Sequence, residues 1–300
     1  PTPNAVATPP SQSVCSGAPI TTIVLTGNVT GTVFNWTRDN VATVTGIASG
    51  SAGDISGTLT NTTNAPVTVT FTITPTANGC PGAPITATVT VYPLPTGSND
   101  TYTSCSGTVV NYDLQNNVNS LPGGNSVISN FSWVALSNNP SINNESLSPQ
   151  SGDFITDMLV NITNIPQAVI YRVTPLSDPG VCAGPFFDIT VTVNPIPTVL
   201  ATDNADPICS GSQTNISVSN PNNVAGTTYN WSAPITAGIT ELAAGAGANG
   251  VLLVTPIQQT LTNTTNAPIL VTFTITPVGP APASCAGTPV TETVLVNPTS

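Results

Sequence analysis

The chain has 300 residues, of which 39% are hydrophobic and only 5% charged, and its net charge is −11 because 13 acidic residues outnumber two arginines. This charge repels nucleic acids and anionic membrane surfaces, so we expect neither as a partner. The chain is too apolar for charge-driven disorder. It contains no apolar run of membrane-spanning length and no signal peptide, so we expect no direct membrane insertion.

One eight-residue phrase recurs at intervals of about 100 residues and divides the chain into three units. Leu59–Pro66 reads Leu-Thr-Asn-Thr-Thr-Asn-Ala-Pro, the same residues return at Leu261–Pro268, and a looser copy covers Leu159–Pro166. Each unit is long enough to bury its own core. The expected domains, called repeats 1, 2 and 3 below, are residues 1–95, 96–197 and 198–300.

The first half of each repeat runs from a Cys-Ser-Gly turn to a strand with two aromatic residues. In repeat 1 the turn starts at Cys15, a β-rich stretch covers Ile20–Leu25, and Phe34 and Trp36 follow. Spacing of two places both rings on one strand face. In repeat 2 the loop before this strand is longer, and it is polar around residues 115–125.

The second half of each repeat predicts two strands on either side of a loop that contains the second cysteine. In repeat 1, Val67–Ile73 alternates apolar residues with threonine, the loop is Gly79–Gly82, and the last strand is Ile85–Val91. A Pro-x-Pro sequence follows at Pro93–Pro95 and recurs at Pro195–Pro197. Proline restricts the backbone to extended conformations, so these segments predict short, semi-rigid linkers.

Aromatic residues recur at the same positions in every repeat, which favours core packing over exposed platforms for sugar stacking. The expected core residues are Trp36, Trp133, Trp231, Phe71, Tyr171 and Phe273. No helical period is convincing, β-branched residues dominate, and turn signals separate about seven short strands in each repeat. We therefore predict an all-β chain of three tandem immunoglobulin-like Greek-key β-sandwiches. The linkers are too short for neighbouring domains to fold back on one another, so the domains should form an extended rod.

Six cysteines are distributed two to a repeat, in matching positions. None forms a Cys-x-x-Cys pair, and the chain has no histidine to complete a zinc site. The simplest interpretation is one disulfide within each repeat, which implies an oxidising, extracellular setting. Closing loops of about 65 to 77 residues would contribute about 4 kcal/mol each in the chain-entropy model. The predicted bonds are Cys15–Cys80, Cys105–Cys182 and Cys209–Cys285.

The full pattern resembles the PKD-like repeats of very large surface adhesins from Bacteroidetes, including the gliding-motility adhesin secreted by the type IX system. It comprises Cys-Ser-Gly, aromatic-x-Trp, Leu-x-Asn-x-Thr-Asn-x-Pro, an alternating strand, Cys-x-Gly and Val-x-Val-x-Pro-x-Pro. The resemblance covers all three units and implies PKD-like sandwiches displayed outside the cell in tandem arrays. It transfers no catalytic or ligand-binding residue, because the shared positions are core, turn and disulfide positions.

Catalytic chemistry has few residues to draw on. Without histidine, lysine or an expected free cysteine, the common general bases and nucleophile activators are missing. The carboxylate pair Asp153 and Asp157 offers the one alternative, in the manner of glycoside hydrolysis, but nothing in the sequence marks it out. We therefore predict no enzyme activity.

We expect the chain to need no cofactor, and bound calcium is the alternative to this expectation. Acidic and Asn-rich segments near the expected domain junctions supply hard oxygen ligands, although no EF-hand or RTX spacing is present. The favoured interpretation is solvated loop carboxylates, and calcium at the junctions would stiffen the array. The candidate ligands are Asn99, Asp100, Asp203 and Asp206.

Together these features predict a structural and adhesive segment of a long extracellular adhesin or surface filament, acting as a disulfide-stabilised stalk at the cell surface. One alternative is a subunit of a self-assembling extracellular fibre, with strand edges pairing between chains. Another is an accessory module of a secreted polysaccharide-degrading enzyme. The expected partners are neighbouring repeats of the same polypeptide, with surface polysaccharide or other copies of the chain as further candidates.

Overall fold

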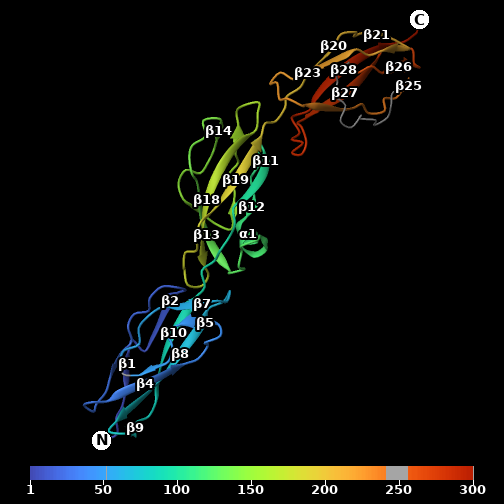
Figure 1. Ribbon diagram of the computed structural model, residues 1–300. Helices are drawn as coiled ribbons and strands as arrows, with labels where there is room; N and C mark the ends of the chain where they lie inside the picture. The colour runs from blue at the N-terminus through green and yellow to red at the C-terminus, as the bar shows by residue number, and fades with distance from the viewer. Residues whose placement is uncertain (52, 241–255, 300) are drawn as a thin grey trace.

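The computed structural model describes residues 1–51, 53–240 and 256–299. Figure 1 shows three β-sandwich domains arranged end to end in an extended rod, with the termini at opposite ends. Each domain has its own hydrophobic core, drawn from a single repeat. The all-β fold class and the extended arrangement are therefore confirmed. No helix within these ranges has the length and apolar character needed to cross a membrane.

Repeat 1 is a sandwich with one large sheet and smaller strand pairs opposite it. Its main sheet has the strand order β2-β10-β8-β4-β6, with β9 beside β8, while the pairs β1-β3 and β5-β7 contribute the facing layer. The strands are β1 (Val6–Thr8), β2 (Ser11–Cys15), β3 (Val24–Thr26), β4 (Val33–Arg38), β5 (Val44–Gly46), β6 (Gly50–Ser51), β7 (Leu59–Asn61), β8 (Val67–Ala77), β9 (Cys80–Pro81) and β10 (Ile85–Tyr92).

Repeat 2 has the same main sheet, in the order β11-β19-β18-β13-β15, and adds a helix in its long polar loop. Asp113 caps helix α1 by accepting a hydrogen bond from the Asn116 backbone, and Leu114 and Val118 turn into the core. The elements are β11 (Asp100–Cys105), β12 (Tyr112–Asp113), α1 (Leu114–Ser120), β13 (Ser129–Ala135), β14 (Ile142–Asn143), β15 (Gln150–Ser151), β16 (Phe154–Ile155), β17 (Val160–Asn161), β18 (Gln167–Ser177) and β19 (Phe187–Asn194).

Repeat 3 repeats this arrangement over its described residues. Its main sheet has the order β21-β28-β27-β24, and β22-β26-β25 and β20-β23 form smaller sheets. The strands are β20 (Leu200–Asp203), β21 (Ile208–Cys209), β22 (Ser212–Gln213), β23 (Ile216–Ser219), β24 (Thr228–Ser232), β25 (Ile239–Thr240), β26 (Thr260–Asn263), β27 (Ile269–Val278) and β28 (Val290–Asn297).

Alternating sequence explains the long hairpin at the centre of each sheet. In β8 the side chains of Val69, Phe71 and Ile73 are fully buried, whereas the intervening threonines face outward. Successive strand residues point to opposite faces, so one face of the sheet supplies the core. The three core aromatic pairs meet at ring-centroid distances of 5.6, 5.7 and 5.9 Å, the first two of them edge to face.

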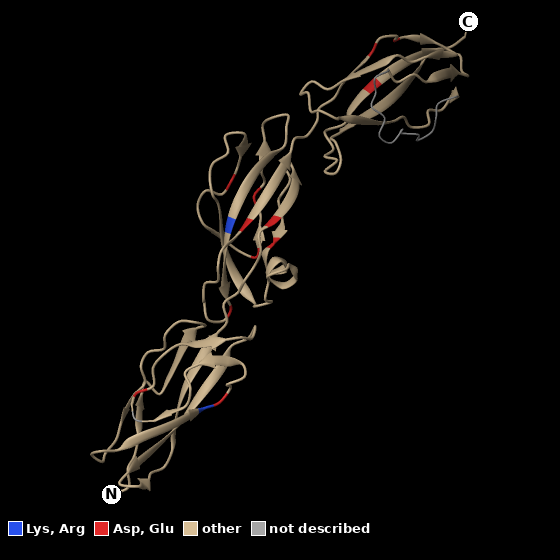
Figure 2. Ribbon diagram, in the orientation of Figure 1, with Lys and Arg blue, Asp and Glu red and all other residues tan. Residues whose placement is uncertain are grey.

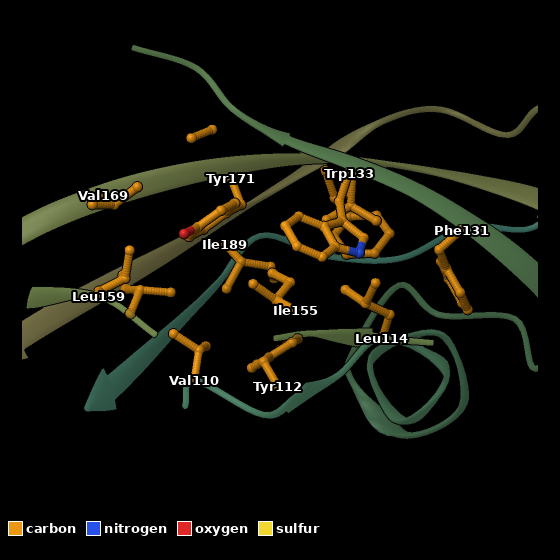
Figure 3. Close-up of a cluster of buried hydrophobic side chains, with 14 of the residues drawn as sticks. Val110, Tyr112, Leu114, Phe131, Trp133, Ile155, Leu159, Val169, Tyr171 and Ile189 are labelled. Carbon is orange, nitrogen blue, oxygen red and sulfur yellow. The ribbon is translucent and has the colours of Figure 1, made fainter. Parts of the chain in front are cut away.

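The six aromatic residues expected in the cores all pack there, although to different degrees. Figure 3 shows Trp133 and Tyr171 side by side in repeat 2, above Ile155 and Ile189. Five of the six are buried, whereas Trp36 is only partly buried at the margin of the repeat 1 core. A side chain at Gly50, on the neighbouring strand β6, would collide with the Trp36 ring, because its Cβ would lie 2.6 Å from a ring atom.

The direction of the first strand of each main sheet decides where its cysteine lies. β2 runs parallel to the last strand β10, and in the same way β11 pairs with β19 and β21 with β28. Each Cys-Ser-Gly cysteine therefore lies beside the residue where the last strand ends. We call this the distal end of the domain, because the chain leaves here for the next repeat. The opposite end, which contains the loop with the second cysteine, is the proximal end.

Candidate functional site at the junctions between repeats

The disulfides connect neighbouring repeats, and the predicted pairing within repeats is wrong. Cys15 of repeat 1 bonds to Cys182 of repeat 2, and Cys105 of repeat 2 bonds to Cys285 of repeat 3, both with a Cα–Cα distance of 5.6 Å. Cys80 and Cys209 are free and exposed. None of the bonds Cys15–Cys80, Cys105–Cys182 and Cys209–Cys285 is present.

Strand direction gives the physical reason for this correction. Cys15 lies opposite Tyr92, at the distal end of β10, whereas Cys80 precedes Ile85, at the proximal end of the same strand. The eight residues of β10 span about 26 Å at about 3.3 Å per residue. A disulfide requires a Cα–Cα distance below about 7 Å, so the two cysteines of one repeat cannot meet. They face different neighbours instead.

At the proximal end, a glycine two residues after the second cysteine receives the incoming linker. A Cβ at Gly184 would lie 1.8 Å from the carbonyl oxygen of Pro95, and one at Gly287 would lie 2.0 Å from that of Pro197. No larger residue fits so close to the backbone. The Cys-x-Gly part of the repeat pattern therefore positions the cysteine and the linker together.

An asparagine amide holds the middle residue of each linker. Asn125 Nδ2 donates to the Leu94 carbonyl at 2.8 Å, and its Oδ1 accepts from the Thr96 backbone at 3.0 Å. Asn222 makes the same two bonds, to Ile196 and Thr198, at 2.8 and 3.0 Å. This two-point grip, called the amide clamp below, fixes the path by which the chain enters each domain. The sequence analysis missed its role, although the asparagines recur in every repeat.

At the distal end, the asparagine of the recurring phrase organises the turn beside the first cysteine. Asn161 is buried, and its amide donates to the carbonyls of Ile165 and Val193 at 2.8 and 2.9 Å. Its Oδ1 accepts from the backbone and hydroxyl of Thr163, and its backbone N–H donates to Ser106 Oγ. Asn61 and Asn263 make the corresponding bonds in the other repeats.

These bonds explain why the phrase and the Cys-Ser-Gly turn recur together. Ser106 follows the cysteine, its backbone N–H donates to the Asn194 carbonyl at the end of β19, and its hydroxyl accepts from Asn161. A buried polar group is costly unless it is paired, and here the asparagine amide is satisfied on both sides. The phrase thus provides a rigid frame around the first cysteine.

Contacts between domains surround each disulfide. Between repeats 2 and 3, a small apolar cavity of about 80 Å³ is lined by Ile165 and Pro166 on one side and by Pro280 and Cys285 on the other. Asn164 Nδ2 donates to the Asn223 carbonyl across this junction at 3.3 Å. Between repeats 1 and 2, Ala65 and Pro66 face the loop of Asp178 and Pro179 across a similar hollow.

The acidic residues proposed as calcium ligands have local hydrogen-bonding roles. Asn99 Oδ1 accepts from the Asp188 backbone, and Asp100 accepts from Thr101 and from the Tyr112 hydroxyl. In repeat 3, Asp203 accepts from the Ala205 backbone and Asp206 from the Leu295 backbone. In the ranges that the structure describes, no cluster of three or more histidine, cysteine or acidic side chains is placed to hold a metal.

Charges are sparse along the rod and do not gather at the junctions. Figure 2 shows most of the acidic residues in repeat 2, on separate strands and loops. Arg172 makes a two-point ion pair with Asp188, at 2.9 and 3.0 Å, and its guanidinium lies 3.9 Å from the centre of the Phe186 ring. Among the described residues, no three carboxylates converge on a point where they could hold a metal ion.

Asp157, one member of the carboxylate pair considered for glycoside hydrolysis, is engaged in structural hydrogen bonds. Asp157 accepts hydrogen bonds from the backbone and hydroxyl of Ser146 and from the Tyr171 hydroxyl at 2.5 Å. Burial raises the pKa of Tyr171 well above its ordinary value, and the bond to Asp157 raises it further. Burial raises the pKa of Tyr112 in the same way. Both phenols stay neutral and serve as structural donors.

Comparisons with known proteins agree with the repeat organisation. The model of the PKD-like domain family matches residues 12–95, 102–197 and 206–300. The comparison with curated proteins found no match.

Three of the solved structures that this chain matches come from animal proteins and share little sequence with it. Mouse cadherin-23 EC22-24 is 11% identical with a TM-score of 0.35, covering 99% of each chain. The human desmocollin-1 ectodomain is 10% identical with a TM-score of 0.40, covering 96% of this chain and 60% of that one. The chicken CNTN1 FN1-FN3 domains are 11% identical with a TM-score of 0.31, covering 94% and 95%. These scores are low, and the likeness carries no argument about function.

Proposed function

Because this chain belongs to the PKD-like domain family, with three tandem copies of the domain, we propose that it is a stiff, load-bearing segment of an extracellular stalk at the cell surface. The observation that carries the proposal is the pair of disulfides between successive repeats. Disulfides persist in oxidising environments outside the cytosol, which supports an extracellular setting. A stalk displays a binding tip at a distance and needs no chemistry of its own.

Stiffness follows from the number of ties at each junction. Repeats 1 and 2 are joined by the linker Pro93–Pro95, by the Cys15–Cys182 bond and by the amide clamp of Asn125. A single flexible linker would let the domains swing freely. Two covalent connections at separate points restrict both bending and twisting, so the array should behave as one rod.

Strand geometry suits the rod to tension along its axis. In repeat 2 the linker holds the start of β11 at the proximal end, and Cys105 at its distal end is bonded to repeat 3. In the same way, Cys182 precedes β19 at the proximal end and is bonded to repeat 1, and the distal end of β19 leads into the next linker. Tension along the axis is therefore carried by the backbones of both strands of the parallel β11-β19 ladder, because each strand is tied covalently at its two ends.

The accessory-module alternative lacks a supporting observation. Within the described residues no group of three or more histidine, cysteine or acidic side chains could hold a metal, so no metal centre favours an accessory module of a polysaccharide-degrading enzyme. The core aromatics that could stack on a sugar are engaged inside the domains. We therefore do not extend the proposal to enzymatic or carbohydrate-binding activity.

Small-angle scattering tests the proposal. A rigid rod of three domains, each about 40 Å long, has a radius of gyration of about 35 Å, whereas a compact 300-residue protein has about 19 Å. We expect the oxidised chain to match the rod. The variant C182S/C285S removes both junction disulfides, and its radius of gyration should fall towards the value of about 25 Å calculated for three freely jointed segments. A compact oxidised particle would contradict the proposed stiff stalk, and a profile unchanged by these substitutions would contradict the role of the disulfides in its stiffness.

A further inference from the structure

The two free cysteines occupy the same positions as the bonded ones, at the two ends of the rod. Cys209 corresponds to Cys15 and Cys105 as the first cysteine of its repeat, and Cys80 corresponds to Cys182 and Cys285 as the second. At both internal junctions, a first cysteine bonds to the second cysteine of the following repeat. The unused partners are therefore a distal first cysteine and a proximal second cysteine, which are the two halves of one further junction.

We propose that Cys209 and Cys80 are docking points for further repeats of this type, joined head to tail by the same disulfide. The inference goes beyond the stalk function, because it identifies a covalent assembly site and the chemistry of its partner. Cys209 would take the proximal end of a following PKD-like repeat, and Cys80 the distal end of a preceding one. A second copy of this chain presents both surfaces.

The distal end of repeat 3 already has the frame that surrounds a bonded first cysteine. The Ser210 backbone N–H donates to the Asn297 carbonyl, and its hydroxyl accepts from the Asn263 backbone at 3.0 Å. The Asn263 amide donates to the carbonyls of Ala267 and Val296 at 2.8 and 2.9 Å. The same bonds surround Cys105, where the junction is closed. Docking would therefore require no rearrangement around Cys209.

The proximal end of repeat 1 is likewise prepared. Pro1-Thr2-Pro3 lies where the linkers of the other repeats lie, with the Pro3 carbonyl oxygen 1.8 Å from the position of a Cβ at Gly82. Asn28 forms the amide clamp, accepting from the Asn4 backbone at 2.9 Å and donating to the Thr2 carbonyl at 3.4 Å. Cys80 lies beside this clamped segment in the same hairpin position as Cys182. The residue after Cys80, Pro81, pairs with Thr76, just as the residue after Cys182, Ala183, pairs with Leu176.

Burial distinguishes occupied from unoccupied positions. Cys182 and Cys285 are 1% and 3% exposed at the closed junctions, whereas Cys80 is exposed. The Cys80 loop is shorter, because Cys80 comes five residues after Pro75 whereas Cys182 comes seven after Pro175. It lacks the equivalent of Pro179, which lines the hollow between repeats 1 and 2. A junction at Cys80 would therefore depend more on its disulfide than the internal junctions do.

The coupling step requires an oxidant, which a disulfide such as oxidised glutathione supplies. The Cys209 thiolate attacks one glutathione sulfur and releases one reduced glutathione. The Cys80 thiolate of the partner repeat then attacks the Cys209 sulfur of this mixed disulfide and releases the second reduced glutathione. The two protein thiols lose their protons and together two electrons, which reduce one oxidised glutathione to two thiols.

Single-cysteine variants separate directed docking from random thiol oxidation. C80S leaves only Cys209 free, and C209S leaves only Cys80 free. Each variant alone should stay monomeric in a glutathione redox buffer, whereas their mixture should give a one-to-one dimer containing the Cys209–Cys80 peptide. Random coupling in the mixture would give heterodimers as only about half of the dimer product. The double variant C80S/C209S is the control and should remain monomeric.

A tandem fusion tests docking within one polypeptide. Residue 298 of the first copy leads directly into residue 2 of the second, which preserves the Pro-x-Pro linker. We expect the first copy's Cys209 to bond to the second copy's Cys80. Bonding in both experiments supports docking between separate chains, and bonding in the fusion alone places the partner repeat in the same polypeptide. Free thiols in the fusion, or Cys80–Cys80 and Cys209–Cys209 dimers in the variants, would overturn the proposal. Scattering from the unfused chain tests stalk stiffness separately, so failure of docking and failure of the stalk are distinguishable.

Discussion

Reduction should greatly lengthen the fully extended chain, because the junction disulfides shorten the covalent path between the termini. Along the oxidised chain, the shortest path runs from residue 1 to Cys15, crosses to Cys182, returns to Cys105, crosses to Cys285 and continues to residue 300. This path contains about 106 residues and extends to about 370 Å at about 3.5 Å per residue. The reduced chain contains about 300 residues and extends to about 1050 Å.

Single-molecule force spectroscopy measures this difference. The chain is pulled from residues 1 and 300, before and after a thiol reductant, in the C80S/C209S background, which prevents coupling between molecules. We expect a final contour length of about 370 Å in the oxidised chain and about 1050 Å after reduction. Disulfides within each repeat would leave about 81 residues on the path and give about 285 Å. That value, or a length unaffected by the reductant, would refute the proposed load path.

Two substitutions test the local structures that hold each junction. Asn161→Ala removes a buried amide that bonds the Ile165 and Val193 carbonyls. It should lower the unfolding free energy of repeat 2 by about 2 to 4 kcal/mol in denaturant titration. The control substitution Asn138→Ala, at an exposed position, should change this free energy little. Equal losses of stability in the two variants would contradict the role assigned to Asn161. Gly184→Ala places a Cβ 1.8 Å from the Pro95 carbonyl oxygen and should cost about 1 to 3 kcal/mol. Its neighbour Ala183→Ser is the matched control, and a Gly184→Ala chain as stable as this control would show that the linker is not held there.

Local patterns in the sequence were sufficient to identify the repeats and their principal strands. The alternation from Val67 to Ile73 specifies one buried face, and Phe71 pairs with Trp36 as its position in the repeat suggests. Helix α1 was missed because its seven residues are mostly polar and only Leu114, Asn117 and Val118 are buried. Too short to show a helical period, it depends on the Asp113 cap and on core contacts.

The disulfide pairing could not be obtained from matching positions alone. Two cysteines per repeat suggested pairing within the repeat, but their positions in space depend on the parallel alignment of β2 with β10, which is a contact between the two ends of the domain. An antiparallel alignment would have reversed β2 and placed Cys15 at the proximal end. The phrase Leu-x-Asn-x-Thr-Asn-x-Pro was visible as a repeat, but the buried hydrogen bonds of Asn61 depend on the same distant strand end.

Peptide mapping under non-reducing conditions, with free thiols blocked before digestion, tests the central claim most directly. The account predicts two disulfide-linked peptides, one joining Cys15 to Cys182 and the other joining Cys105 to Cys285, with Cys80 and Cys209 carrying the blocking group in the monomer. Peptides joining Cys15 to Cys80, Cys105 to Cys182 or Cys209 to Cys285 would contradict it, because each would close a bond within one repeat and leave the junctions without a covalent tie.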